Sequence, residues 1–250
     1  MSVSLITPAS VGGFSSCLRN CQRIMTNRAI SRLPAAVLWD MDGTIVDTEP
    51  YWIDAEYDIV EAHGGTWSHE HAKALVGSDL LDSGAYIREH GGVDREPVEI
   101  VEMLLDRVVA RIQVEVPWRP GARELLADLR SVGVPTALVT MSWRRFADEV
   151  VRCLPEGSFD AVVVGDDVQF GKPHPEPYLT AARLLGVDPE HCLAIEDSPT
   201  GVRSAIDAGC RVLGVPHVVD IPMFDDSENR LTLARTLDGM SVQSLRELFG

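Results

Sequence analysis

Two aspartates separated by one residue, Asp40 and Asp42, end an apolar run and are followed by Gly43. Residues two apart on an extended segment project to the same side, so both carboxylates can reach one ligand. Because adjacent carboxylates repel, the pair favours a bound cation or a shared proton. Gly43 lets the backbone turn and expose N–H groups. An EF-hand would need Glu at its twelfth position, which is Tyr51 here. A pair of solvated turn carboxylates stays an alternative for this motif taken alone.

Hydroxyl-bearing residues end a second apolar run, where Thr140 is followed by Met141 and Ser142. Hydroxyl groups and the N–H groups of a helix start are suitable partners for phosphate oxygens. Ser142 could equally be an ordinary helix N-cap. This segment therefore supports a phosphate site only in combination with others.

Charged residues follow two more apolar runs. Lys172 lies in the segment GKPHP, and a lysine with a merely solvated role rarely needs a loop so restricted by prolines. Glu196 and Asp197 end a later run and can complete a hard-cation site with Asp40. Together these side chains predict a site for a cation and a phosphate group.

The elements that must position these residues alternate between strand and helix. Short apolar runs typical of buried parallel strands occur at 35–39, 135–140, 160–164, 192–196 and 211–215. Apolar residues recur near helical spacing at 121–131, 142–153, 175–185 and 200–208. This alternation predicts an α/β fold whose helices cover both faces of a parallel sheet. Ligands bind outside the carboxyl ends of the strands in such sheets, which is where the polar residues fall.

The interval from 50 to 118 does not follow this alternation of strands and helices. It shows helical periodicity at 52–62, 70–76, 80–90 and 96–112, and it has no convincing strand pattern. We expect an all-helical domain at 50–118 inserted into an α/β core domain formed by 35–49 and 119–250.

The segment 1–34 has four arginines and no acidic residue, which predicts a disordered leader or a mis-annotated start.

Composition limits the possible partners. A formal net charge of −16 over 250 residues repels nucleic acid and anionic membranes, so we expect neither as a partner. The five cysteines are scattered and form no C-x-x-C pair, which indicates a reducing compartment. We expect a soluble cytoplasmic protein, with a monomer favoured and the oligomeric state left open.

Four motifs, DMDGT, VTMS, GKPHPEPY and IEDSPTG, occur in this order with the helical interval between the first two. In this the chain resembles the haloacid dehalogenase superfamily, in particular the subgroup of beta-phosphoglucomutase and phosphoglycolate or sugar-phosphate phosphatases. The resemblance implies a doubly wound, Rossmann-like core with a helical cap. Met141 departs from it, since relatives often have Asn there.

The resemblance also implies a role for each motif residue. Asp40 would be the nucleophile that forms an aspartyl-phosphate, and Asp42 the general acid and base. Thr140 and Lys172 would contact the transferring phosphoryl group. The metal would be Mg²⁺, and its implied ligands are Asp40, the backbone carbonyl of Asp42, Asp197, and Glu196 directly or through water. Further phosphate- or substrate-binding residues would be Gly43, Met141, Ser142 and, in the cap, Ser78.

The function that these expectations favour is a Mg²⁺-dependent phosphatase acting on a small phosphorylated metabolite, such as a sugar phosphate or a phosphoglycolate-like ester. A phosphosugar mutase is the alternative, but a mutase must hold a second phosphate, and the acidic Asp79 beside Ser78 weakens that interpretation. A second alternative is a non-catalytic phosphate-binding or regulatory module.

Overall fold

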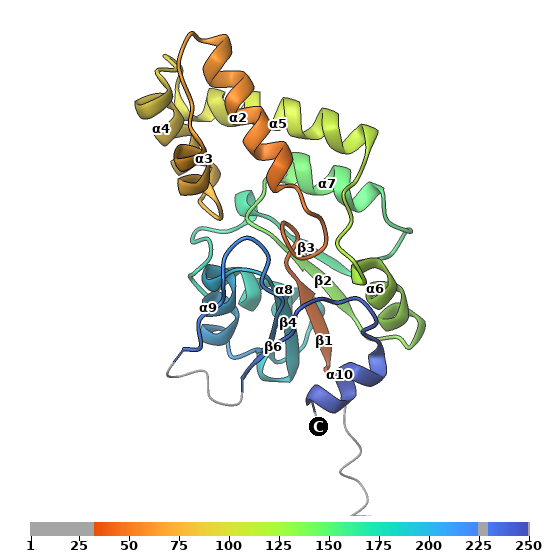
Figure 1. Ribbon diagram of the computed structural model, residues 1–250. Helices are drawn as coiled ribbons and strands as arrows, with labels where there is room; N and C mark the ends of the chain where they lie inside the picture. Colours follow the sequence, from red (N-terminus) through yellow and green to blue (C-terminus); the bar gives the residue numbers. More distant parts are fainter. Residues whose placement is uncertain (1–32, 225–229, 250) are drawn as a thin grey trace, which may run out of the picture.

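A computed structural model describes residues 33–224 and 230–249 (Figure 1). Nearly all of the predicted leader, 1–34, therefore lies outside the described residues. Six parallel strands form one sheet in the order β3-β2-β1-β4-β5-β6. The strands are β1 Ala36–Trp39, β2 Thr136–Val139, β3 Ala161–Val163, β4 Cys192–Glu196, β5 Arg211–Gly214 and β6 Leu231–Leu233.

The central strands are buried on both faces, which explains their continuous apolar sequences. All four residues of β1 are buried, and they alternate between two apolar clusters. Val37 and Trp39 belong to one cluster, and Ala36 and Leu38 to the other. The side-chain period of two along a strand thus supplies both faces of the sheet.

Helices cover each face. The cluster that contains Leu38 is completed by α8 (Glu176–Leu185) and α9 (Pro199–Asp207). The cluster that contains Trp39 is completed by α6 (Ala122–Ser131), α7 (Arg144–Arg152) and α10 (Val242–Phe249). The predicted α/β fold with a doubly wound parallel sheet is confirmed.

The strand order places the site. From β1 the chain continues to β2 and β3 on one side of the sheet, and then crosses to β4 on the other side of β1. The connections therefore reverse direction between β1 and β4. Such a switch point opens a crevice outside the carboxyl ends of the two strands. Asp40 directly follows β1, and Glu196 is the last residue of β4.

A helical insert, which we define as residues 49–114, lies between β1 and α6. It contains no strand, and its helices are α2 Glu49–Ala62, α3 His69–Leu75, α4 Leu80–Gly91 and α5 Pro97–Val114. In Figure 1 the insert lies beyond the end of the sheet, with α5 next to α7 of the core. Its status as a separate domain, with boundaries at 50 and 118, stays a prediction.

The two chain segments that join the insert to the core are hydrogen-bonded to each other. The N–H of Asp47 donates to the carbonyl of Pro117, and the N–H of Arg119 donates to that of Ile45. The insert is therefore attached through a paired connection.

None of the helices within residues 33–224 and 230–249 combines the length and apolar character that crossing a membrane requires.

The strand β6 is not predicted by the sequence pattern. It has three residues, pairs with β5 at the edge of the sheet, and only its first residue, Leu231, is buried. An edge strand this short leaves too little apolar alternation to be recognised.

Candidate active site

Lys172 joins three segments at the carboxyl end of the sheet. Its ammonium group donates to Asp40 Oδ1 at 2.7 Å, to Glu196 Oε1 at 2.6 Å and to the carbonyl oxygen of Val139 at 2.9 Å. The lysine side chain is only 6% exposed. Burial alone would lower the pKa of Lys172, but the charges of Asp40 and Glu196 outweigh it and raise this pKa. The ammonium is therefore a fixed positive charge beside Asp40.

Glu196 is completely buried, and both of its oxygens are hydrogen-bonded. Oε1 accepts from Lys172 and from the hydroxyl of Tyr178, at 2.7 Å for the latter. Oε2 accepts from the N–H of Asp197 and from the hydroxyl of Ser198. Space for this carboxylate depends on Gly201, where an added Cβ would lie 1.8 Å from Glu196 Oε1.

Three carboxylates converge beside the lysine. Oxygen atoms of Asp40, Glu196 and Asp197 all lie within 4.8 Å of one another. Burial raises the pKa of Asp40 to about 7, against the lowering effect of Lys172. Burial together with the charges of Asp40 and Glu196 raises the pKa of Asp197 to about 9. Carboxylates that are hard to ionise together are stabilised by a cation among them.

The side chain of Asp42 takes part in a different set of contacts. Its Oδ1 accepts from the hydroxyl of Thr48 at 2.5 Å. Its Oδ2 accepts from Ser142 at 2.8 Å and from Thr140 at 3.3 Å. Asp42 thus lies next to the three-carboxylate cluster, while its side chain is held by hydroxyl groups. A carboxylate in this setting can exchange a proton with a neighbouring ester oxygen or water.

Residues 34–209 match the family model of the haloacid dehalogenase-like hydrolases. The chain belongs to this family. It is 33% identical to hexitol phosphatase B of Escherichia coli K12 over 72% of this chain and 83% of that protein. It is 34% identical to a phosphorylated carbohydrates phosphatase of Thermotoga maritima, over 73% and 85% of the two chains.

A solved structure agrees with the family membership. A variant of CbbY from Rhodobacter sphaeroides in complex with xylulose-1,5-bisphosphate matches with a TM-score of 0.75 and 26% sequence identity. The match covers 85% of this chain and 99% of that one. The predicted membership of the haloacid dehalogenase group is confirmed.

Several residues that the sequence singled out lie together in this haloacid dehalogenase-type site. Asp40, Lys172, Glu196 and Asp197 form one cluster. The side chain of Asp42 is next to it but is not one of the clustered carboxylates. Their catalytic and metal-binding roles stay predictions.

Other predicted binding residues make different contacts from those expected. The N–H of Gly43, expected to face phosphate, donates to the carbonyl of Val46 at 2.7 Å. The sulfur of Met141 lies 3.2 Å from the backbone nitrogen of Lys172 and packs against the lysine loop. The hydroxyl of Ser142 donates to Asp42. Ser142 is not the N-cap of α7, which is Trp143.

The segment around Ser78 has a local structural role. Ser78 is exposed on the turn between α3 and α4, and its N–H donates to the carbonyl of Leu75. The Asp79 carboxylate accepts from the N–H groups of Leu81 and Asp82 and so caps α4. Helix capping accounts for an acidic residue at this position, so Asp79 is weaker evidence against a mutase than the sequence suggested.

Thr48 and Tyr178 are site residues that sequence reasoning missed. Thr48 precedes α2 as its N-cap, yet its hydroxyl contacts Asp42 and caps no N–H group. The sequence shows only a threonine before a helix, for which capping is the default expectation. Tyr178 lies within the quoted motif GKPHPEPY, so the motif was the signal that could have found it.

Proposed function

We propose that this chain is a Mg²⁺-dependent phosphatase that hydrolyses a small phosphorylated sugar or polyol through an aspartyl-phosphate on Asp40. One observation carries the proposal. A buried lysine bridges Asp40 and Glu196 while Asp197 lies beside them, which supplies a nucleophile, a fixed positive charge and a cation site within one cluster.

The residues present fit a magnesium ion. All three clustered groups are carboxylates, which are the hard oxygen ligands that Mg²⁺ takes. Asp40 Oδ2 is buried and has no hydrogen-bond partner among the described residues, which fits an oxygen atom that can coordinate a cation. Asp40, Glu196 and Asp197 would hold the ion, joined by the backbone carbonyl of Asp42. When bound, Mg²⁺ would neutralise charge on the phosphoryl oxygens.

In the first step the Asp40 carboxylate forms a bond to phosphorus as the ester P–O bond breaks. Asp42 gives its proton to the leaving alcohol oxygen. The Lys172 ammonium, held at Asp40 Oδ1, neutralises negative charge on the phosphoryl group. The hydroxyl of Thr140 turns from Asp42 to a phosphoryl oxygen.

In the second step the ionised Asp42 takes a proton from water, whose oxygen attacks the phosphorus atom of the aspartyl-phosphate. The bond between Asp40 and phosphorus breaks, and inorganic phosphate leaves. Thr48 and Ser142 keep the Asp42 carboxylate oriented through both proton transfers. We assign the helical insert the role of a cap that excludes water and selects the substrate.

The substrate class follows from the relatives. Hexitol phosphatase B and the phosphorylated carbohydrates phosphatase carry names that specify phosphorylated polyols and sugars, and each is at least 33% identical to this chain. A hexose or hexitol monophosphate is accordingly the substrate that we favour over phosphoglycolate.

The test is a phosphate-release assay with Mg²⁺ on hexose phosphates, hexitol phosphates, phosphoglycolate and sugar bisphosphates. Asp40→Asn should abolish release from every ester that the wild type hydrolyses, because the amide is not a nucleophile. The matched control is Asp54→Asn, which changes an exposed aspartate paired with Arg111 in the insert and should keep the wild-type rate.

Two results would contradict the proposal. Equal phosphate release by Asp40→Asn and the wild type would exclude an aspartyl-phosphate intermediate on Asp40. An isomerised product from a sugar phosphate, formed with little inorganic phosphate, would identify a mutase.

A further inference from the structure

Tyr178 is a fully buried tyrosine on α8 whose hydroxyl points at the site. The hydroxyl donates to Glu196 Oε1 at 2.7 Å, and the same oxygen accepts from Lys172 at 2.6 Å. The lysine ammonium also lies 5.2 Å from the centre of the tyrosine ring. Tyr178 therefore contacts both members of the buried ion pair behind Asp40.

The ring of Tyr178 has an ordinary packing role, but its hydroxyl does not. The ring belongs to the apolar cluster that α8 and α9 form with the sheet, which also contains small residues such as Ala181 and Ala205. A phenylalanine would fill the same space. Within residues 33–224 and 230–249, the hydroxyl adds one hydrogen bond, to Glu196, and the reason for tyrosine over phenylalanine lies in that contact.

The shared oxygen couples Tyr178 to the position of Lys172. The ammonium group is held between Asp40 Oδ1 and Glu196 Oε1 at nearly equal distances, 2.7 and 2.6 Å. The phenol takes part of the hydrogen-bonding capacity of Oε1, and it fixes the direction in which the carboxylate faces the lysine. Without it, Glu196 would attract the ammonium more strongly, and the lysine would move away from Asp40.

We propose that Tyr178 is a positioning residue that holds Lys172 against Asp40 through Glu196. The proposal rests on the phosphatase function proposed above. Tyr178 touches neither the substrate nor the reacting atoms. Its effect should therefore appear in the rate of phosphoryl transfer and leave substrate binding nearly unchanged.

The experiment compares Tyr178→Phe with the wild type for phosphate release from the best hexose or hexitol phosphate. We expect kcat to fall about tenfold, the order of effect of one hydrogen bond to a buried charge, with KM within about twofold. Tyr86→Phe is the matched control. It removes the same hydroxyl from a tyrosine of the insert that packs on Trp67 and His90, and it should keep the wild-type kcat.

A second measurement separates positioning from stability. Glu196→Gln removes the charge through which Tyr178 acts, so Tyr178→Phe should change the residual kcat less than about twofold in that background. Thermal unfolding of each variant shows whether the fold is kept.

Three outcomes would overturn the proposal: an unchanged kcat in Tyr178→Phe, the same fold-change with and without Glu196→Gln, or a Tyr178→Phe protein that cannot fold. The last would assign the hydroxyl to stability alone. Failure of the wild type to release phosphate from any ester would instead count against the proposed function, so the two ideas fail separately.

Discussion

The carboxylate of Asp197 lies directly against the backbone of Gly43. An added Cβ at residue 43 would lie 2.0 Å from Asp197 Oδ2, and Gly43 has a φ of +85°. Glycine is required here by the close approach as well as by the backbone conformation. Gly43 therefore determines where one carboxylate of the cation site can lie.

Gly43→Ala should displace Asp197 and weaken magnesium binding. We expect the Mg²⁺ concentration for half-maximal phosphate release to rise at least about tenfold, because one of the proposed carboxylate ligands is lost from its place. The measurement is a magnesium titration of phosphate release.

Gly133→Ala is the control for backbone strain alone. Gly133 has a φ of +74°, in the turn between α6 and β2, and an added Cβ there meets nothing within 4 Å. The left-handed backbone conformation alone should cost each variant on the order of 1 kcal/mol of stability. Only Gly43→Ala should change the magnesium requirement, and an unchanged requirement in both would show that Asp197 tolerates the displacement.

At the residue scale, the sequence predicts those side chains that directly follow strands. Asp40 and Asp197 could be placed together because parallel strands bring their carboxyl ends to one edge. The N–H of Gly43 could not, since its bond to the carbonyl of Val46 depends on how the loop after β1 folds back. The contact between Thr48 and Asp42 likewise depends on a side-chain rotation that spacing does not specify.

Within α2, Glu56 is a buried acid outside the site. It is 6% exposed, and its Oε2 accepts from Trp67 Nε1 at 3.0 Å. Burial raises the pKa of Glu56 to about 8, although the hydrogen bond from Trp67 opposes the shift. The folded insert thus keeps a proton that the unfolded chain loses near the ordinary value of 4.5.

The contribution of Glu56 to the stability of the folded protein therefore falls as pH rises. Because the folded pKa of Glu56 lies above the unfolded one, its contribution is intact below pH 4.5 and is lost between pH 4.5 and about 8. Glu56→Gln keeps an acceptor for Trp67 and removes the titration. Between pH 5 and pH 8 the stability of this variant should gain on the order of 3 kcal/mol relative to the wild type.

Urea unfolding at several pH values measures this difference. The control is Glu61→Gln, which changes an exposed glutamate of the same helix and should follow the wild type at every pH. Parallel curves for Glu56→Gln and the wild type would mean that Glu56 is ionised in the folded protein.

At the element scale, helices with a strong apolar period are well predicted, and short edge strands are not. The stretch expected at 96–112 is the helix Pro97–Val114, whose buried face includes Ile100, Leu104 and Val108. The strand Leu231–Leu233 has one buried residue and leaves no such signal. Burial of one face, which produces the period, is what makes an element visible in sequence.

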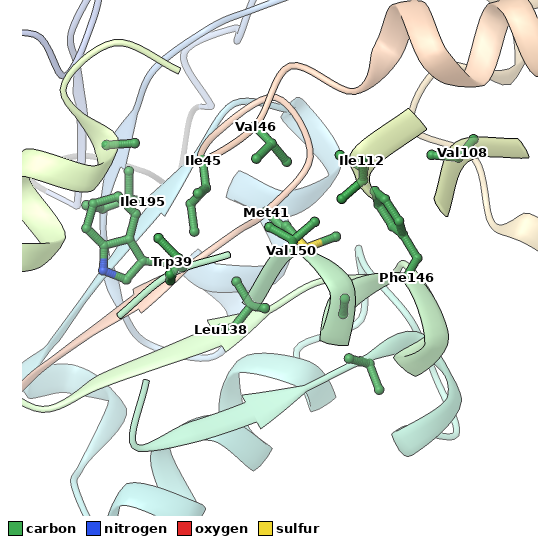
Figure 2. Close-up of a cluster of buried hydrophobic side chains, with 14 of the residues drawn as sticks. Trp39, Met41, Ile45, Val46, Val108, Ile112, Leu138, Phe146, Val150 and Ile195 are labelled. Carbon is green, nitrogen blue, oxygen red and sulfur yellow. The ribbon is translucent and has the colours of Figure 1, made fainter. Parts of the chain in front are cut away.

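At the scale of the whole molecule, the strand order could be expected from the family resemblance, but the packing of the insert on the core could not. Helical periodicity at 50–118 predicts the helices of the insert but not the core residues that they contact. The structure shows one apolar cluster that continues from the sheet into the insert, with Phe146 of α7 near Ile112 and Val108 of α5 (Figure 2). Contacts between distant segments of this kind leave no periodic signal in either segment.

Phe146 is the residue through which this continuity can be tested. Its side chain is fully buried, and its ring meets Trp52 of α2 edge to face at 5.4 Å between centroids. The ion pairs of the neighbouring Arg145 with Glu102 and Asp106 of α5 are exposed, and such pairs contribute little. Apolar packing that includes Phe146 therefore contributes more to the attachment of the insert to α7 than these ion pairs do.

Phe146→Ala should cost about 3–5 kcal/mol and should uncouple the two parts. We expect the wild type to unfold in a single calorimetric transition, because one apolar cluster spans both parts. The variant should unfold in two transitions.

Phe159→Ala is the control, since Phe159 packs against the same cluster just before β3. Its loss should lower the temperature of the single transition without dividing that transition in two. A single transition in Phe146→Ala would mean that the paired connections at Asp47 and Arg119 are enough to keep the insert and the core cooperative.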